Sequence, residues 1–295
     1  MIEQPEQPPQ HTQRTPYVVG DIHGCLETYL CLEHKIEVHA KKFGFDPLII
    51  SVGDLVDRGP RSAEVVERFL RGEKEGTHAA IIGNHEVEFL KNIYSARPEL
   101  FVEAGTTFPW HIETFEQEFE GDIKEIVTFD EYRIFQRIHW YFQGGIEALK
   151  SYHCNPKDPE SWAISPEHIR YLASMPLFWE NEDIIVTHGF AKDRDYEILK
   201  SLQTAISAIK GTSRLPEEPI LEREAAHNAI WSRKLPRHPM DPKRLHCSGH
   251  TPVPRVRRLT EINAMQIDTG CVYGRRLTAY CPSVDQVVSV KSLET

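Results

Sequence analysis

Residues Tyr17-Val18-Val19-Gly20-Asp21-Ile22-His23-Gly24 are the most informative about the fold, because they join a β-branched apolar run directly to a polar turn bounded by glycines. The same arrangement recurs four more times along the chain. Short apolar runs that end at Gly, Asp or His are typical of buried strands. The other runs, with the polar residues after them, are 48–52 before Gly53-Asp54, 79–82 before Gly83-Asn84, 184–187 before His188-Gly189, and 245–248 before Gly249-His250.

Helical patterns separate the early strands. Apolar residues over 26–43 keep a period near that of an α-helix and stop at Gly44, and a second such pattern covers 63–70. Strands that alternate with helices predict an α/β core whose first strands are parallel. Two later apolar runs, 264–267 and 287–290, follow short connections, so we expect the second half to pair partly in antiparallel fashion.

These patterns predict one domain over 16–291, preceded by a Pro- and Gln-rich tail over 1–15 that is expected to be disordered. Residues 87–182 interrupt the strand series with aromatic and acidic residues at helical spacing, and we interpret them as a helical insertion that covers one edge of the core. Residues 211–219 and 234–243 are Pro-rich and are predicted to be loops. We expect Trp110, Trp140 and Tyr141 of the insertion to form one wall of a substrate groove.

Composition excludes several classes of protein. The chain of 295 residues has 34 Lys and Arg against 44 Asp and Glu, a formal charge of −10, which argues against a nucleic-acid partner. There is no run of 18 apolar residues, so a membrane partner is excluded. The six cysteines form no CxxC pair and the N-terminus lacks the apolar core of a signal peptide, so we expect reduced thiols and a cytoplasmic location. The oligomeric state is not determined.

The charge is unevenly distributed. Residues 233–276 contain ten Lys and Arg against three Asp and Glu, a local charge of +7. Such a stretch in an acidic protein suggests attraction of an anionic ligand. A solvated face with salt bridges explains it equally well.

The polar residues at the strand ends carry the chemistry. Ligands of α/β sheets bind beyond the carboxyl ends of the strands, so the five ends are expected to converge. Their oxygen and nitrogen atoms suit two divalent metal ions, with manganese favoured and iron or zinc as alternatives. Asp21 and His23 can share one ion, and the carboxylate of Asp54 can bridge both. The remaining candidate ligands are Asn84, His188 and His250.

Four other residues are candidates for catalysis. His85 follows Asn84 on the opposite side of an extended segment, so we interpret it as a general acid for the leaving group. Asp57 would fix its tautomer and raise its pKa. Arg58 and Arg233 are candidates to hold phosphate oxygens through their planar guanidinium groups. Glu86 is expected to brace the loop of Asn84 and His85.

With these residues in view, the sequence resembles the phosphoprotein phosphatase family of calcineurin-like metallophosphoesterases. The three-part signature of that family is Gly-Asp-x-His-Gly, Gly-Asp-x-x-Asp-Arg-Gly and Gly-Asn-His-Glu, and it stands here at 20–24, 53–59 and 83–86. The later histidines also match, in Thr187-His188-Gly189 and Ser248-Gly249-His250-Thr251. The resemblance spans about residues 17–281. It implies a four-layer α/β fold, described also as α+β-like, in which two mixed sheets form a sandwich flanked by helices.

The resemblance also implies roles for individual residues. It places the first metal on Asp21, His23 and Asp54, and the second on Asp54, Asn84, His188 and His250. His85 is the implied acid, paired with Asp57, and Arg58 contacts phosphate. Arg233 transfers less directly, because Trp-Ser-Arg only approximates the family's context. The implied reaction is in-line attack by a hydroxide bound to the two metals, without a phosphoenzyme.

Three functions fit these residues. Gly59-Pro60-Arg61-Ser62 and 268–274 resemble the bacterial branch, which includes symmetrical diadenosine tetraphosphate hydrolases. Those hydrolases tend to have a small residue in place of Asp57, so its presence favours hydrolysis of phosphomonoesters, foremost phosphoserine and phosphothreonine in proteins. A hydrolase of dinucleoside polyphosphates or other nucleotides is the alternative. A non-catalytic, metal-bearing phosphate-binding protein is the third.

Overall fold

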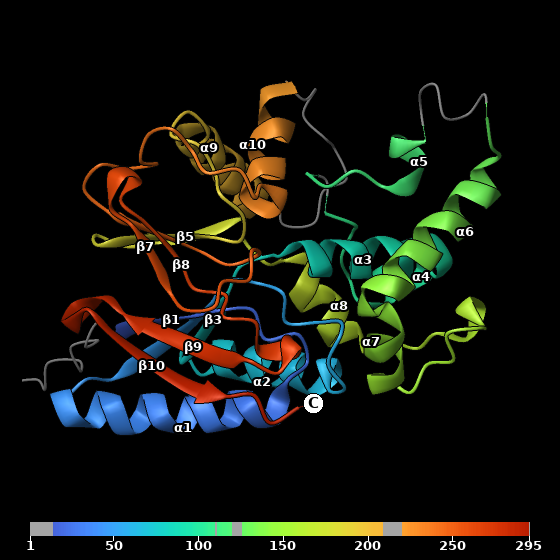
Figure 1. Ribbon diagram of the computed structural model, residues 1–295. Coiled ribbons are helices and arrows are strands. Elements are labelled where there is room, and N and C mark those ends of the chain that lie inside the picture. The colour runs from blue at the N-terminus through green and yellow to red at the C-terminus, as the bar shows by residue number, and fades with distance from the viewer. Residues whose placement is uncertain (1–13, 110, 120–125, 209–219, 295) are drawn as a thin grey trace, which may run out of the picture.

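Two five-stranded mixed sheets pack face to face, with helices on both outer faces (Figure 1). The computed structural model describes residues 14–109, 111–119, 126–208 and 220–294. The layers therefore run helix, sheet, sheet, helix, as the resemblance implied.

The first sheet has the strand order β10-β9-β1-β2-β3. Strand β1 pairs in parallel with β2, and β2 in parallel with β3, whereas β9 and β10 add antiparallel pairs. The strands are β1 (Thr15–Val19), β2 (Pro47–Ser51), β3 (His78–Ala80), β9 (Arg276–Cys281) and β10 (Gln286–Lys291).

The second sheet has the order β4-β5-β6-β8-β7. Its three central strands are parallel, and both of its edge strands are antiparallel to their neighbours. The strands are β4 (Phe178–Glu180), β5 (Ile184–Thr187), β6 (Leu245–Ser248), β7 (Arg257–Leu259) and β8 (Ala264–Gln266). Each apolar run that was predicted to be a strand is therefore a strand, and the mixture of directions also agrees.

The apolar runs are continuous because the strands are buried on both faces. Val18 and Ile50 lie in the core between the sheets, which also contains Ile184 and other residues of the second sheet. Tyr17 and Val19, which alternate with Val18, lie in the core beneath the helices. Successive side chains of a strand point to opposite faces, so a strand covered on both sides needs apolar residues at every position.

Helices cover the outer faces. Helix α1 (Leu26–Phe43) ends as predicted at Gly44, whose φ of 70° lets its backbone N–H bond the carbonyl groups of the last turn. Helix α2 (Ser62–Lys74) lies beside α1 under the first sheet. Helices α9 (Asp195–Ala208) and α10 (Ile220–Trp231) cover the second sheet in Figure 1. Short 3₁₀ turns η4 (Thr260–Ile262), η5 (Cys271–Tyr273) and η6 (Pro282–Val284) connect the last strands.

The insertion is mostly helical and lies at one end of the sandwich (Figure 1). The insertion was expected to span residues 87–182. Helix α3 (Asn84–Ala96) begins before that start, and β4, near the expected end, belongs to the second sheet. The other elements are α4 (Glu99–Glu103), α5 (Phe115–Glu118), α6 (Phe129–Trp140), η2 (Tyr141–Gly145), α7 (Ile146–Ser151), η3 (Pro159–Ser161) and α8 (Pro166–Ala173). Its apolar residues share one core with α1 and α2, so it is built onto the domain.

The N-terminal tail, the loops, the cysteines and the absence of a membrane span were also predicted from the sequence. Most of the expected tail (1–13) and the expected loop 211–219 lie outside the described residues, and β1 already begins at Thr15. All six cysteines are free thiols. Within the described parts of the chain, no helix has both the length and the apolar character needed to cross a bilayer.

Candidate active site

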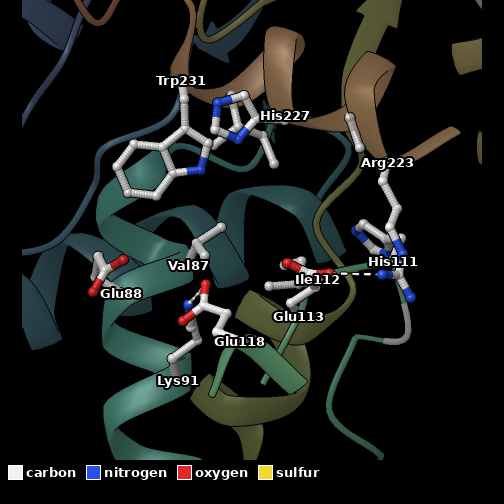
Figure 2. A pocket seen from close by; sticks show the side chains of 12 residues that line it. Val87, Glu88, Lys91, His111, Ile112, Glu113, Glu118, Arg223, His227 and Trp231 are labelled. Carbon is white, nitrogen blue, oxygen red and sulfur yellow. Dashed lines mark hydrogen bonds and ion pairs between the residues drawn. The ribbon is translucent and has the colours of Figure 1, made fainter. Parts of the chain in front are cut away.

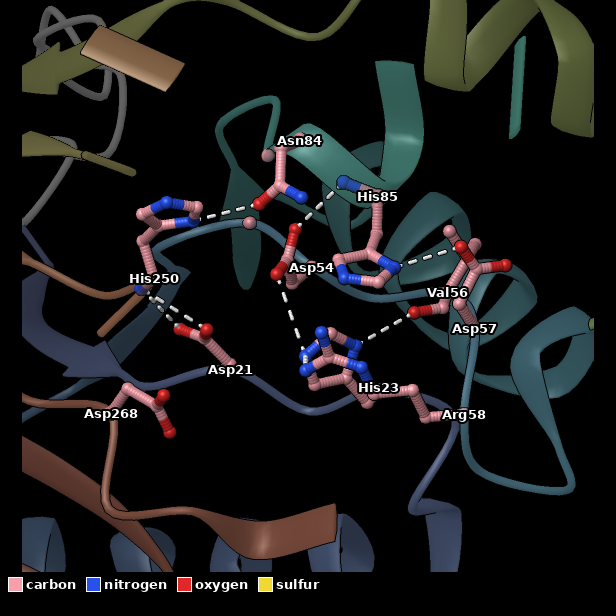
Figure 3. Close-up of polar contacts among 12 residues, drawn as sticks. Asp21, His23, Asp54, Val56, Asp57, Arg58, Asn84, His85, His250 and Asp268 are labelled. Atoms are coloured by element: carbon pink, nitrogen blue, oxygen red, sulfur yellow. Dashed lines mark hydrogen bonds and ion pairs between the residues drawn. The ribbon is translucent and has the colours of Figure 1, made fainter. Parts of the chain in front are cut away.

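Segments that follow five strands meet at one edge of the sandwich (Figure 3). Three of these segments follow β1, β2 and β3 of the first sheet, and two follow β5 and β6 of the second. The six predicted metal ligands are all buried at this edge: Asp21, His23, Asp54, Asn84, His188 and His250.

The backbone of the site is strained. Among the described residues, eight non-glycine residues have positive φ, and five of them belong to the predicted site. These five are His23, Asp54, Asp57, Arg58 and His250, with φ between 49° and 67°. L-residues rarely adopt this conformation, and it persists where surrounding contacts hold the chain. The turns are therefore shaped by the site they form.

Glu86 supplies the contacts that hold two of these turns. Its buried carboxylate accepts hydrogen bonds from the backbone N–H groups of Gly83, Asp54, Leu55 and Val56, at 2.7–3.2 Å. Gly83 has no space for a side chain, because a Cβ there would lie 2.3 Å from Asp54 Oδ1. Glu86 thus braces the loop as predicted, and it also fixes the turn that carries Asp54.

Three of the predicted ligands of the second ion converge closely. His250 Nδ1 lies 2.8 Å from Asn84 Oδ1 and 3.2 Å from His188 Nε2. His188 donates its Nδ1–H to the carbonyl oxygen of Val52 at 2.7 Å, so its Nε2 faces the other ligands. A second contact of this kind orients histidine ligands in metal sites.

Asp54 connects this group to the first predicted ion. Its Oδ1 lies 3.3 Å from His188 Nε2, whereas its Oδ2 lies 3.4 Å from His23 Nε2. His23 is oriented like His188, because its Nδ1–H donates to the carbonyl oxygen of Val56 at 3.0 Å. The carboxylate therefore faces both groups, which is the arrangement a bridging ligand requires. The spacing of its atoms allows metal groups of Asp54 with His188 and His250, and of Asp54 with His23 and His85.

The electrostatics of the site favour bound positive charge. Burial opposes the charged form of His188, but Asp54 and then Asp21 outweigh it and raise the pKa of His188 to about 10. Burial likewise opposes ionisation of Asp54, yet His188 and its neighbours hold the pKa of Asp54 well below its usual range. The oxygen and nitrogen donors present fit a pair of divalent cations.

Asp21 lies at the margin of this arrangement. Its two carboxylate oxygens accept the backbone N–H of His250 at 3.3 and 3.1 Å. Burial and the nearby Asp268 raise its pKa well above the ordinary value (Figure 3). Asp268 was not among the predicted site residues. The signal was present, because Asp268-Thr269-Gly270 follows β8 as the other motifs follow their strands.

His85 and Asp57 form the predicted pair. His85 Nδ1–H donates to Asp57 Oδ2 at 2.8 Å, and both side chains are buried. Burial alone would lower the pKa of His85, but Asp54 and Asp57 outweigh it, so the pKa is raised. The His85 ring packs edge to face against His23, with centroids 4.6 Å apart. This places a proton-bearing imidazole beside the predicted metal ligands.

Trp140 does not lie where it was expected. The expected groove wall contained Trp110, Trp140 and Tyr141, but Trp140 is fully buried. Its Nε1–H donates to Asp57 Oδ2 at 2.9 Å. Trp110 lies outside the described residues. The insertion therefore reaches the site through a hydrogen bond to Asp57, for which the sequence alone gave no signal.

The two candidate arginines lie on opposite sides of the site. Arg58 Nη1 donates to His23 Nε2 at 2.8 Å, and its guanidinium lies 5.6 Å from the ring of Tyr273. Arg233 Nε donates to His250 Nε2 at 3.1 Å. Both guanidinium groups therefore lie beside predicted metal ligands.

Three arginines of the basic stretch 233–276 contact groups of the protein itself. Arg258 pairs with Asp285, and Arg276 donates to the side chain of Ser289. Arg244 pairs with Glu180 and Asp241. For Arg244 and Arg258 the salt-bridged surface is the better explanation.

The comparisons with known proteins agree with this geometry. The model of the calcineurin-like phosphoesterase family matches residues 15–265. The chain is 24% identical over 286 residues to an asymmetrical bis(5′-nucleosyl)-tetraphosphatase, PrpE, of Bacillus velezensis, covering 93% of this chain and 92% of that protein. It is 42% identical over 83 residues to a symmetrical bis(5′-nucleosyl)-tetraphosphatase of Pseudomonas fluorescens, covering 26% of this chain and 25% of that protein.

The fold is shared with a solved structure of low sequence identity. A mutant of a cold-active protein tyrosine phosphatase superposes with a TM-score of 0.50 at 13% identity, over 94% of this chain and 80% of that one. The strand order, the strand-end site and the family match agree with one another. The chain belongs to the calcineurin-like phosphoesterase family, and it is a phosphoesterase by fold and by motif.

Proposed function

We propose that this protein hydrolyses phosphate monoesters at the site around Asp54, with two divalent metal ions. One observation carries the proposal. The two carboxylate oxygens of Asp54 face different histidines, His188 and His23, at 3.3 and 3.4 Å. Two metal ions that share a ligand are a known arrangement for the cleavage of phosphate esters.

Six residues would hold the ions. We assign His23, Asp21 and Asp54 to the first, and Asp54, Asn84, His188 and His250 to the second, with manganese favoured. When bound, such ions activate water for attack and neutralise charge on the phosphate oxygens. His188 and His23 are ready for this role, because a backbone carbonyl holds the Nδ1–H of each.

His85 would supply the proton for the leaving alkoxide. Its Nδ1–H is held by Asp57, so the proton for transfer is on Nε2, on the side of the ring away from Asp57. Asp57 stabilises the protonated ring, which supports an acid at neutral pH. The proton moves from Nε2 to the ester oxygen as the bond between phosphorus and that oxygen breaks.

Arg58 and Arg233 would hold the phosphate. A guanidinium can donate two parallel hydrogen bonds to two oxygens of one phosphate group. A bound metal ion and the guanidinium of Arg58 cannot both occupy the lone pair of His23 Nε2, so Arg58 must turn away when the ion binds. The backbone N–H of Arg58 stays fixed by the carbonyl oxygen of Gly144 at 3.1 Å, which leaves only the side chain to move.

Two substrate classes follow from different observations. The pairing of His85 with Asp57 favours phosphoserine and phosphothreonine esters, whose alkoxide leaving groups need an acid. The names of relatives that align over 93% of this chain favour dinucleoside tetraphosphates instead. A panel of phosphopeptides, nucleotides and diadenosine tetraphosphate, assayed with manganese, decides between them. Absence of turnover for every ester, by protein that binds manganese, would favour a phosphate-binding role.

A further inference from the structure

A cavity of about 310 Å³ lies between α3, residues 111–113, α5 and α10, outside the groups described so far (Figure 2). We call it the side cavity. Its volume is at the lower end of the range for small-molecule sites. It therefore suits one compact ring system, and it is too small for an extended peptide.

The side cavity begins where the predicted active site ends. Val87 and Glu88, which line it, lie in the first turns of α3, whose first residues are Asn84 and His85. The four steps from Asn84 to Glu88 rise about 6 Å along the helix. A group attached to a phosphate at the metal ligands by a short linker therefore reaches the cavity.

Helix α10 borders the side cavity from the opposite side and is also tied to the site. Trp231, its last residue, lines the cavity. The next residue, Ser232, accepts the backbone N–H of Phe190 at 2.8 Å, and Arg233 contacts His250. The position of Trp231 relative to the metal ligands is therefore set by backbone contacts.

The side cavity offers a flat aromatic surface opposite an apolar one. The indole of Trp231 is stacked with the ring of His227, with centroids 6.3 Å apart and an interplanar angle of 18°. Figure 2 shows the indole on the side of α10 that is turned toward Val87 and Glu88 of α3. Ile112 adds to the apolar lining. A planar ring is the ligand shape that such a lining favours.

Two basic side chains of the side cavity form ion pairs with two of its carboxylates, and the carboxylate of Glu88 lies outside these pairs. Lys91 pairs with Glu118, and Arg223 pairs with Glu113 at 2.7 Å. Glu88 makes no ion pair with any described residue, and burial raises the pKa of its carboxyl group. A carboxylate in this position accepts hydrogen bonds from N–H groups of a ligand.

We propose that the side cavity binds the purine base of a nucleotide substrate, stacked on Trp231 and hydrogen-bonded through its N–H groups to Glu88. The phosphate stays at the metal ligands and the sugar spans the first turn of α3. This inference rests on the proposed phosphoesterase activity and adds the class of leaving group. It also predicts binding of the nucleoside alone, which requires no catalysis.

The test compares substrates with and without a base. Values of kcat/KM are measured for guanosine and adenosine 5′-monophosphates and for p-nitrophenyl phosphate, and the ratio of nucleotide to aryl phosphate is taken. Because loss of base stacking weakens binding substantially, Trp231→Ala should lower this ratio about tenfold, mainly through KM. Trp231→Phe should restore most of it, and Glu88→Gln should lower it as well. Phe135→Ala and Glu103→Gln, at exposed positions away from the cavity, are the matched controls.

A binding measurement separates this inference from the proposed function. Guanosine and adenosine are titrated into the wild-type protein and the variants by isothermal titration calorimetry, with thermal melts as a check of folding. Saturable binding that Trp231→Ala and Glu88→Gln weaken supports the inference, even if no ester is hydrolysed. The inference is overturned if neither nucleoside binds to the wild-type protein. It is also overturned if folded Glu88→Gln and folded Trp231→Ala both keep the wild-type ratio of nucleotide to aryl phosphate turnover. If Trp231→Ala does not fold, a wild-type ratio in both Glu88→Gln and Trp231→Phe overturns it.

Discussion

The indole Nε1–H of Trp140 donates to Asp57 Oδ2 at 2.9 Å, on the same oxygen that accepts the Nδ1–H of His85. Trp140 and Asp57 are 83 positions apart in the sequence. Oδ1 of the same carboxylate has no hydrogen-bond partner among the described residues. The orientation of Asp57 therefore depends on Trp140 and His85 together.

Trp140→Phe tests this dependence. The phenyl ring keeps most of the packing but removes a hydrogen bond to a charged group, so we expect kcat for an alkyl phosphate to fall about tenfold. An aryl phosphate, whose leaving group needs less acid assistance, should be affected less. Steady-state kinetics on both esters provides the measurement.

Trp162→Phe is the matched control for this variant. Trp162 is also buried, and its Nε1–H donates to a backbone carbonyl, that of Asn155, at 2.8 Å. It should lower stability to a similar degree without changing the preference between the two esters. Equal losses on both esters in Trp140→Phe would contradict a role in orienting the acid.

His85→Asn removes the predicted acid. General acid catalysis contributes about 10² to 10⁴ in rate, so we expect a loss of this size with both metal ions still bound. Turnover and metal content measured on the same preparation check the two parts separately. His168→Asn is the control, because His168 is also a buried histidine paired with a carboxylate, that of Glu67 at 2.9 Å. Near wild-type turnover in His85→Asn would mean that another group protonates the leaving group.

Asp54→Asn should reduce the binding of both ions, because this carboxylate faces both ligand groups. Elemental analysis after loading with manganese should show fewer than two ions per chain. Wild-type protein should gain about 2.7 kcal/mol of stability at a metal concentration 100 times the dissociation constant, and Asp54→Asn should not. Asp195→Asn, another buried carboxylate with hydrogen-bond donors, should bind metal normally. Full occupancy in Asp54→Asn would refute the bridging role.

The lowered pKa of His246 predicts that the folded protein loses stability in mild acid. Burial lowers its pKa to about 4 from an ordinary value of 6.5. Between these values the unfolded chain binds a proton that the folded chain does not, so stability decreases as the pH falls through this window. The slope reaches about 1.4 kcal/mol per pH unit, and it is absent above the ordinary pKa.

The measurement for His246 is urea denaturation of metal-free protein at several pH values from about 7 to 5. His246→Gln should be less stable at neutral pH, because the contact of Nε2 with Thr187 Oγ1 at 2.6 Å is altered. Its stability should nevertheless fall less steeply with acid than that of the wild type. Parallel profiles would show that His246 is not the group responsible.

The convergence of the candidate metal ligands was predictable because the signal is local. Asp21, Asp54 and Asn84 each follow a short apolar strand within a few residues, and parallel neighbours bring such ends together. His85 was identified from the same motif, but the structure places it in the first turn of α3 and not in the extended segment that was expected. The strain at these turns was not, because positive φ at residues other than glycine arises from contacts such as those of Glu86.

The buried side of helix α6 in the insertion could not be predicted from the sequence. Helical spacing indicated helix α6, and the helix is present. Spacing does not say which side is buried. The structure buries Trp140 against Asp57 and leaves Phe135 66% exposed. A groove wall made by Trp140 would require the indole to be exposed.

The strands, the candidate ligands at their ends and the family motifs could be predicted from the sequence, because residues adjacent in the chain carry each of those patterns. The partner of Asp57, the position of Asp268 beside Asp21 and the side cavity between α3 and α10 arise from the packing of the folded chain. Each of these joins segments far apart in the chain. Their contact depends on how helices and sheets pack, which no local pattern of residues encodes.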